Sequence, residues 1–227
     1  KAWRSFDHAI DYHPFSIGSA GYFKGPFYIG PAQPLFSTTE LPADLPECFQ
    51  NGKGGRPLFM TTLSFVEPFG VKAFLRAVRK LEKHWSEGCR LLENANPHTE
   101  DPYLKKEIES HRALCCLFLC FIRTALHMTE FYRLRDSFQQ ESYSPEQARE
   151  KLKAMRKIAQ EELTNTKCAL ELVRTDHRIA FSYPYRYGIS EEMCLYKLAH
   201  TKKLIEHILP QRYYEITFSR NRHPIWL

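Results

Sequence analysis

Several stretches of the chain carry apolar residues at steps of three and four, the spacing of one buried face of an α-helix. The clearest stretch follows Ser144, which is expected to cap a helix whose first turn holds Pro145, with Gln147 completing a capping box. Its inward positions recur at steps of 3, 4, 4, 3, 4 and 3: Leu152, Met155, Ala159, Leu163, Thr166, Leu170 and Val173. This stripe is typical of the seam of a helical bundle.

Three further long helices are predicted from the same spacing. They cover residues 69–94, residues 102–140 and a range that starts at Ser190 and ends before Pro210. Since the connections between the helices are short, neighbouring helices are expected to be antiparallel. The predicted fold class is therefore mainly α, an antiparallel bundle of about four long helices.

The first third of the chain has a different character. A short helix is predicted over residues 1–12, and residues 13–68 form a long loop segment rich in Pro, Gly and aromatic residues, with one short strand over residues 58–65. The apolar side chains of this segment are too many for a free linker: Phe15, Tyr22, Phe23, Phe27, Tyr28, Leu35 and Phe36. We therefore expect residues 1–68 to pack on a neighbouring domain, while residues 69–227 form the bundle and an extended basic tail from Leu209.

Composition and charge narrow the class of protein. Hydrophobic residues make up 43% of the chain and charged residues 26%, so neither a disordered chain nor an integral membrane protein is expected. The longest apolar run, residues 113–122, is shorter than the about 20 residues that a bilayer span needs. The net charge is +6, but acidic and basic residues interleave along the predicted helices, so a nucleic-acid partner is not expected.

The cysteines suggest a reducing compartment. The chain has seven, an odd number, and most occupy apolar positions of the predicted helices. Free, buried thiols are therefore expected, which favours a cytoplasmic location. A secreted or periplasmic protein stays an alternative, because the chain begins at Lys1 rather than Met, so that either its start has been removed or it is a piece of something longer.

Motifs for catalysis and metal binding are missing from the sequence. There is no Gly-x-Gly-x-x-Gly, no Walker loop, no Gly-x-Ser-x-Gly, no Cys-x-x-Cys and no His-Glu-x-x-His. None of the ten histidines has an acidic residue three positions before it, as a di-iron bundle requires. We therefore expect no cofactor and no metal, and we interpret Cys116 and Cys120 as small buried hydrophobic residues rather than zinc ligands or a redox pair.

Two polar clusters stand out. Arg123, His127 and Arg135 lie in the second half of the most apolar predicted helix, and a group of charged and aromatic residues from Arg174 to Tyr187 follows the next helix. Charges at such positions either tie helices together or form a polar interface with another domain. The sequence leaves both interpretations open.

The ordered set of motifs resembles a known family. The motifs are WRSFDHAI from Trp3, GPAQPL from Gly30, LEKHWSEGCRLL from Leu81, FIRTALHMTEFYRLRD from Phe121 and LVRTDHRI from Leu172. In order and spacing they resemble the C-terminal α-helical region of large bacterial multidomain glycoside hydrolases, over nearly the whole chain. In that family the region follows a catalytic (β/α)8 barrel. The chain departs from the family pattern at His127, where Asn is common, and at Ile179-Ala180, where Leu-Gly is common.

The resemblance implies an accessory domain that supports the barrel, walls the substrate cleft and is not catalytic alone. Its main partner would be the barrel of the same polypeptide, with carbohydrate and a second copy of the chain as further candidates. The residues expected at the substrate cleft or domain interface are Tyr12, His13, Phe15, Tyr22, Tyr28, Arg123, His127, Arg135, Asp176, Arg178 and Tyr187.

Two alternatives remain open at this stage. The first is a self-sufficient helical bundle that binds a protein partner or a small ligand. The second is a nucleic-acid binder acting through the basic tail, where Arg212, Arg220 and Arg222 carry charge of one sign. The ordered motifs favour the interpretation of the chain as part of a glycoside hydrolase.

Overall fold

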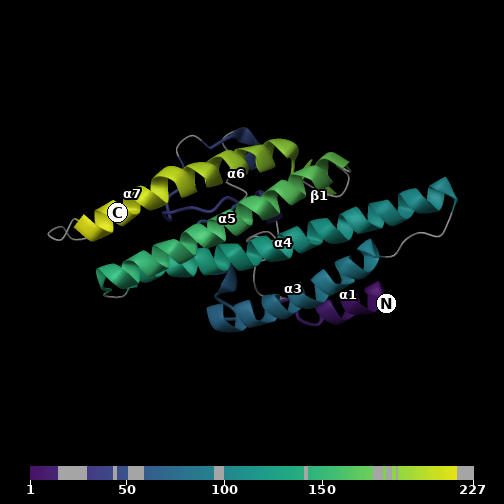
Figure 1. Ribbon diagram of the computed structural model, residues 1–227, viewed down its shortest axis with the longest axis horizontal. Coiled ribbons are helices and arrows are strands. Elements are labelled where there is room, and N and C mark those ends of the chain that lie inside the picture. Colours follow the sequence, from purple (N-terminus) through teal and green to yellow (C-terminus); the bar gives the residue numbers. More distant parts are fainter. Residues whose placement is uncertain are drawn as a thin grey trace.

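Figure 1 shows the computed structural model of the chain. It describes residues 1–14, 30–42, 45–50, 59–94, 100–140, 143–175, 181–182, 186–187 and 189–218. The elements are α1 (Ala2–Ile10), η2 (Gly30–Ala32), η3 (Glu47–Phe49), η4 (Ser64–Val66), α3 (Val71–Glu93), α4 (Pro102–Gln140), α5 (Pro145–Thr175), β1 (Phe181–Ser182), β2 (Arg186–Tyr187), α6 (Glu191–Lys203), a π-helical turn η6 (Leu204–Ile208) and α7 (Leu209–Phe218).

The long helices lie side by side and form one bundle. The order across the molecule is α1, α3, α4, α5 and then the continuous α6–η6–α7 rod, and consecutive helices run in opposite directions (Figure 1). The mainly α antiparallel bundle predicted from the sequence is therefore confirmed. The predicted bounds of α4 and the start of α5 at Pro145 also agree with the structure.

The last helix continues beyond its predicted end. In an α-helix the ring of Pro210 would clash with the carbonyl of Glu206. The π-helical turn avoids this by widening the helix, so that the Leu209 N–H donates to the Leu204 carbonyl five residues earlier. The helix therefore passes Pro210, and the prediction of an extended chain from Leu209 is wrong for residues 209–218.

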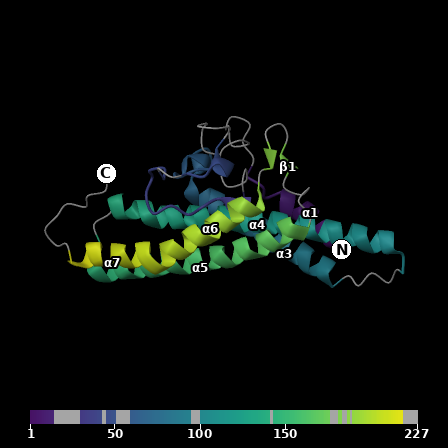
Figure 2. The same ribbon diagram turned by 90° about the horizontal axis from the view of Figure 1, so that it is seen from above.

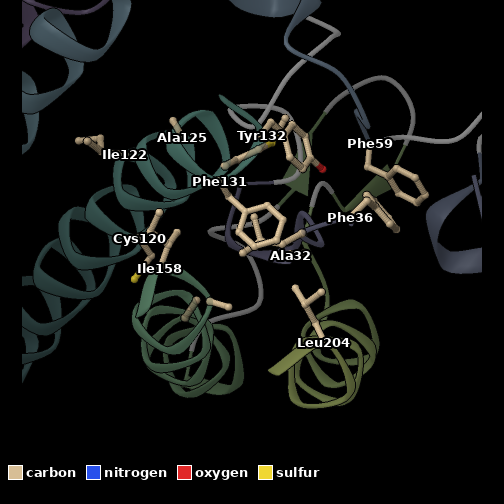
Figure 3. Packing of buried hydrophobic residues seen from close by; sticks show 14 of the residues in the cluster. Ala32, Phe36, Phe59, Cys120, Ile122, Ala125, Phe131, Tyr132, Ile158 and Leu204 are labelled. Atoms are coloured by element: carbon tan, nitrogen blue, oxygen red, sulfur yellow. The ribbon is translucent and has the colours of Figure 1, made fainter. Parts of the chain in front are cut away.

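The described part of the segment after α1 packs on the chain's own helices. Leu35 is fully buried and Phe36 nearly so, and both belong to the main hydrophobic core of the bundle. Figure 3 shows Ala32 and Phe36 among side chains of the helices, including those of Phe131 and Leu204. For these residues the expected packing on another domain is corrected: the surface that they cover is the chain's own bundle.

The strand expected over residues 58–65 is also absent from the described part of that range. The Met60 N–H is bound by the side-chain oxygen of Gln33 at 3.0 Å rather than by a neighbouring strand, and the chain then enters η4. The ladder that the described residues do contain is short and antiparallel, with Phe181 opposite Tyr187. It stands on the same side of the helical layer as the described loop segments (Figure 2).

Helix α1 packs on α3 through a close aromatic contact. The Phe6 and Trp85 rings lie 4.6 Å apart between centroids, and the Ser5 hydroxyl donates to the His84 carbonyl at 2.8 Å. Gly88 makes this approach possible, because a Cβ at that position would lie 2.2 Å from the Phe6 ring. The residue is needed here for space rather than for backbone freedom.

Helix α4 is the central helix. Within the described part of the chain it is the helix long and apolar enough to cross a membrane by length and composition alone. Just over half of its most apolar window is buried by the rest of the protein. Ile122, Ala125 and Met128 are fully buried.

Candidate functional site

The inner face of α5 holds polar residues where the bundle seam would otherwise be apolar. Glu162, Asn165 and Thr166 follow Ile158 and Ala159 at helical spacing and are buried against α4 and α6. Glu162 has no exposed surface at all. A carboxylate in such a place must find both charge and hydrogen bonds inside the protein.

Lys197 of α6 supplies the charge. Its Nζ donates to Glu162 Oε1 and, at 2.9 Å, to the carbonyl of Pro31, and Lys197 is likewise fully buried. The ion pair therefore joins α5, α6 and η2 in one contact. Because both charges are sealed from water, each depends on the other for stability.

Helix α4 completes the shell around the carboxylate. The Thr124 hydroxyl donates to Glu162 Oε1 at 2.6 Å, and His127 Nδ1 lies 2.5 Å from Oε2. The Asn165 amide lies 3.5 Å from Oε2 and donates to the Cys120 carbonyl at 2.9 Å. We call these five residues (Thr124, His127, Glu162, Asn165 and Lys197) the carboxylate network.

The electrostatics of this network favour an ionised carboxylate. Burial by itself would raise the pKa of Glu162, but the charge of Lys197 and the hydrogen bond from His127 outweigh burial and lower the pKa to about 2. Burial lowers the pKa of Lys197, and the Glu162 charge opposes that change. At neutral pH the carboxylate is a permanent anion.

Such a carboxylate is unsuited to acid–base catalysis. A general acid or base needs a pKa near the working pH and contact with the substrate. Glu162 has a pKa of about 2 and no exposed surface. The network therefore positions helices rather than reacting groups.

A second polar group holds the segment that begins with η2, residues 30–38, which we call the leader. Arg135 Nη1 donates to the carbonyls of Phe36 and Thr38 at 3.1 and 3.0 Å. The Arg135 guanidinium also lies over the Tyr132 ring at 4.1 Å, and its Nε binds Asp136 at 2.7 Å. Asp136 thus balances the charge of Arg135, while Arg135 Nη1 binds the backbone of the leader.

Tyr132 and Gln33 join the leader to the chain around Met60. The Tyr132 hydroxyl donates to the Met60 carbonyl at 3.0 Å, and the Gln33 amide donates to the same carbonyl at 3.0 Å. His200 Nε2 lies 2.9 Å from the Leu35 carbonyl. The side chains of α4 and α6 therefore satisfy main-chain carbonyls that a buried loop would otherwise leave unpaired.

The predicted residues of α4 do not form one site. Arg123 points to α3, where its Nε donates to Glu82 at 3.1 Å, while His127 joins the carboxylate network and Arg135 holds the leader. Each residue ties α4 to a different element. All three side chains hold α4 against the elements that pack on it.

The other predicted residues are only partly described. The Tyr12 ring stacks on His84 at 5.6 Å, and burial lowers the pKa of His13. Tyr187 lies in β2, but its side chain is outside the described part of the structure. The remaining predicted residues lie outside the described ranges: Phe15, Tyr22, Tyr28, Asp176 and Arg178.

Glu162 and Lys197 are not among the site residues predicted from the sequence. A signal did exist. Glu162 stands four positions before Thr166 of the inward stripe, and Lys197 stands three positions after Cys194 and four before Thr201. Opposite charges in the apolar stripes of two neighbouring helices indicate a buried pair.

The described residues contain no group of three or more His, Cys, Asp or Glu side chains that could hold a metal ion. The fold and the polar groups define the class of this protein as a mainly α antiparallel bundle with a sealed internal ion pair. Comparison with protein families, curated proteins and solved structures finds no match to the chain.

Proposed function

We propose that the chain is the C-terminal accessory helical domain of a glycoside hydrolase, which supports the catalytic barrel and is not catalytic alone. The ordered motifs from Trp3 to Ile179 support the link to glycoside hydrolases. The geometry supports the architectural role. In the described part of the chain, the buried polar side chains of the carboxylate network and of Arg135 bind one another and the chain's own backbone.

The observation that carries the architectural role is the anchoring of the leader. Donors from the helices and from Gln33 reach five main-chain carbonyls of the leader, those of Pro31, Pro34, Leu35, Phe36 and Thr38, and also the carbonyl of Met60. A segment held at so many points has a defined position relative to the helices. The bundle can therefore act as a rigid frame for whatever the adjoining loops contact.

The outer face of α1 is the best candidate for contact with a barrel. Trp3 is 60% exposed and Ile10 is 59% exposed, and both border a groove of about 490 Å³ that reaches Trp85. Exposed apolar side chains that gather at a groove are typical of interaction sites. The leader itself is not available for docking, since its apolar side chains are already buried.

Two measurements test the proposal. The purified chain should show no turnover of a panel of aryl glycosides, and the reading frame before Lys1 should encode alternating strands and helices. When that upstream region is expressed as a separate chain, it should bind the bundle, and W3E or I10E should weaken binding at least tenfold. L195E, which changes an equally apolar and 46% exposed residue of α6, is the control and should have no effect. Hydrolysis by the isolated chain would refute an accessory role.

A second candidate is a self-sufficient bundle that binds a small ligand or a protein. One observation favours it: the leader and the helices share one continuous core, so the chain can fold without a neighbour. A groove of about 350 Å³ between α5 and α7, lined by Arg149, Lys153 and Tyr213, would suit an anionic aromatic ligand. A start codon directly before Lys1 would favour this candidate over the first.

A further inference from the structure

The groove between α5 and α7 has an apolar floor and the size of a small-molecule site. The two helices pack against each other after the last helix has passed Pro210 (Figure 2). Leu152 and Leu209, which lie at the floor, are 7% and 4% exposed. The volume of about 350 Å³ falls in the range of about 300–1,000 Å³ that is typical of ligand sites.

The π-helical turn η6 sets the wall of the groove that α7 provides. Its hydrogen bond from the Leu209 N–H to the Leu204 carbonyl adds one residue to the turn, so the residues after it are rotated about the helix axis relative to a regular α-helix. Leu209 and Tyr213, four positions apart on α7, therefore lie on one side and both line the groove. Single π-helical turns inside α-helices are frequent at functional sites.

The wall that α5 provides carries three positive charges. Arg149, Lys153 and Arg156 stand at steps of four and three, so they share one face of the helix and line the groove. Within the described ranges none of the three forms an ion pair, whereas the next cation of α5, Lys157 outside the groove, lies 3.7 Å from Glu161. Like charges at this spacing repel each other, and an anion in the groove would balance them.

Tyr213 places a hydrogen-bond donor and a ring opposite these charges. Arg149 Nη2 donates to the Tyr213 hydroxyl at 2.8 Å, and the Arg149 guanidinium lies 5.6 Å from the centre of the Tyr213 ring. Because the hydroxyl accepts this bond, its own O–H can donate to a ligand. Tyr214, which is 64% exposed, adds a second ring at the edge of the groove.

We propose that this groove binds a small aromatic phosphate, with the phosphate between Arg149, Lys153 and Arg156 and the ring over Leu209 and Tyr213. A phosphate monoester carries a charge of about −1.5 to −2 at neutral pH and three acceptor oxygens, which three cations can satisfy. Guanidinium groups bind such oxygens in pairs, and the apolar floor takes the ring. This assignment rests on the second candidate function, a bundle that binds a small ligand, and does not depend on the accessory role.

The groove beside α1 provides an internal comparison. It is larger, about 490 Å³, and it also has aromatic walls, from Trp3 and Trp85. Its two charged residues, Arg4 and Asp7, have opposite signs. This groove therefore has no excess of positive charge and is not expected to select a phosphate.

The test is calorimetric titration of the whole chain with 1-naphthyl phosphate at pH 7 and low salt. Saturable binding with a Kd below about 1 mM is expected. Inorganic phosphate and 1-naphthol should each bind at least about tenfold more weakly, since each reaches only half of the site. 1-Naphthoate, with one negative charge, should fall between them and the phosphate, and added salt should weaken binding because the cations are exposed.

Matched variants of exposed residues locate the site. K153M and R156M should each weaken the binding of 1-naphthyl phosphate about tenfold, because each removes a charge-assisted contact. K157M, one residue after Arg156 and outside the groove, should leave the Kd unchanged. Since all three side chains are exposed, the Tm of each variant should match that of the wild type.

Three results would overturn the proposal. The first is the absence of saturable binding, or equal losses in K153M, R156M and K157M. The second is binding of 1-naphthol as tight as that of 1-naphthyl phosphate, which would show a merely apolar groove. The third is a concentration-dependent dimer that K153M abolishes, which would place a second copy of the chain in the groove. The tests with aryl glycosides and with the upstream region decide the accessory role separately.

Discussion

Removing the positive charge of Lys197 should destabilise the bundle strongly. In K197M the Glu162 carboxylate keeps Thr124 and His127 but loses the cation that balances it, and the Pro31 carbonyl loses its 2.9 Å donor. Breaking a fully buried ion pair by removing one partner costs about 3–5 kcal/mol. For a chain of this size that corresponds to a fall in Tm of about 6–20 °C.

The pH dependence of the free energy of unfolding identifies the charge of Glu162 as the cause of this destabilisation. In the wild type the folded-state pKa of Glu162 is about 2, against 4.5 for the ordinary group. Because the folded value is the lower one, ionised Glu162 stabilises the fold above pH 4.5, and this contribution is lost as the pH falls from 4.5 toward 2. A tenfold change in proton affinity is worth about 1.4 kcal/mol, so the contribution is about 3 kcal/mol.

K197M should show the opposite trend in that window. Without the cation, burial raises the pKa of Glu162, so protonation relieves an unbalanced buried charge. The stability difference between wild type and K197M should therefore be largest at pH 7 and should shrink toward pH 3. Urea unfolding followed by far-UV circular dichroism at both pH values measures it.

The control is the double variant E162Q/K197M. Removing both charges while keeping an acceptor for Thr124 should restore much of the stability lost in K197M, since paired removal of a buried ion pair is often nearly neutral. If K197M is destabilised equally at pH 7 and pH 3, or if the double variant is as unstable as the two single variants combined, the account of the carboxylate network is wrong.

Three further predictions concern the leader. Y132F should lower the free energy of unfolding by about 0.5–1.5 kcal/mol, because the Met60 carbonyl loses one of its two donors and keeps the Gln33 amide; urea unfolding measures this, and an unchanged midpoint would contradict it. G30A should cost about 2–4 kcal/mol by the same assay, since Gly30 has φ +46° and an added Cβ would lie 2.3 Å from the Phe121 ring. R135M should speed limited proteolysis within the leader, because two carbonyls lose their donor, while R133M on the exposed side of α4 should not.

The helices could be predicted because their signals are local. The apolar stripe and the capping residues at Ser144 and Pro145 depend on neighbours within two turns, so the start of α5 follows from a few residues. Local rules failed at Pro210. There the widened η6 turn, which belongs to a helix held against α5, overrides the proline as a stop signal.

The destination of the leader could not be predicted in the same way. Its aromatic residues indicated burial, but nothing local distinguishes the chain's own helices from another domain. The contacts that decide this join residues about a hundred positions apart, as between Arg135 and Phe36. The candidate residues of α4 were correctly recognised as unusual, yet their separate partners on α3, α5 and the leader depend on the same long-range packing.

By itself the sequence determined the class of fold, the number of long helices and most of their bounds, because helical periodicity is a property of neighbouring residues. Only the tertiary structure decided which charges are sealed inside the bundle. Glu162 and Lys197 are 35 positions apart, on α5 and α6. Their chemistry arises from distances across the bundle, which are set when the helices pack.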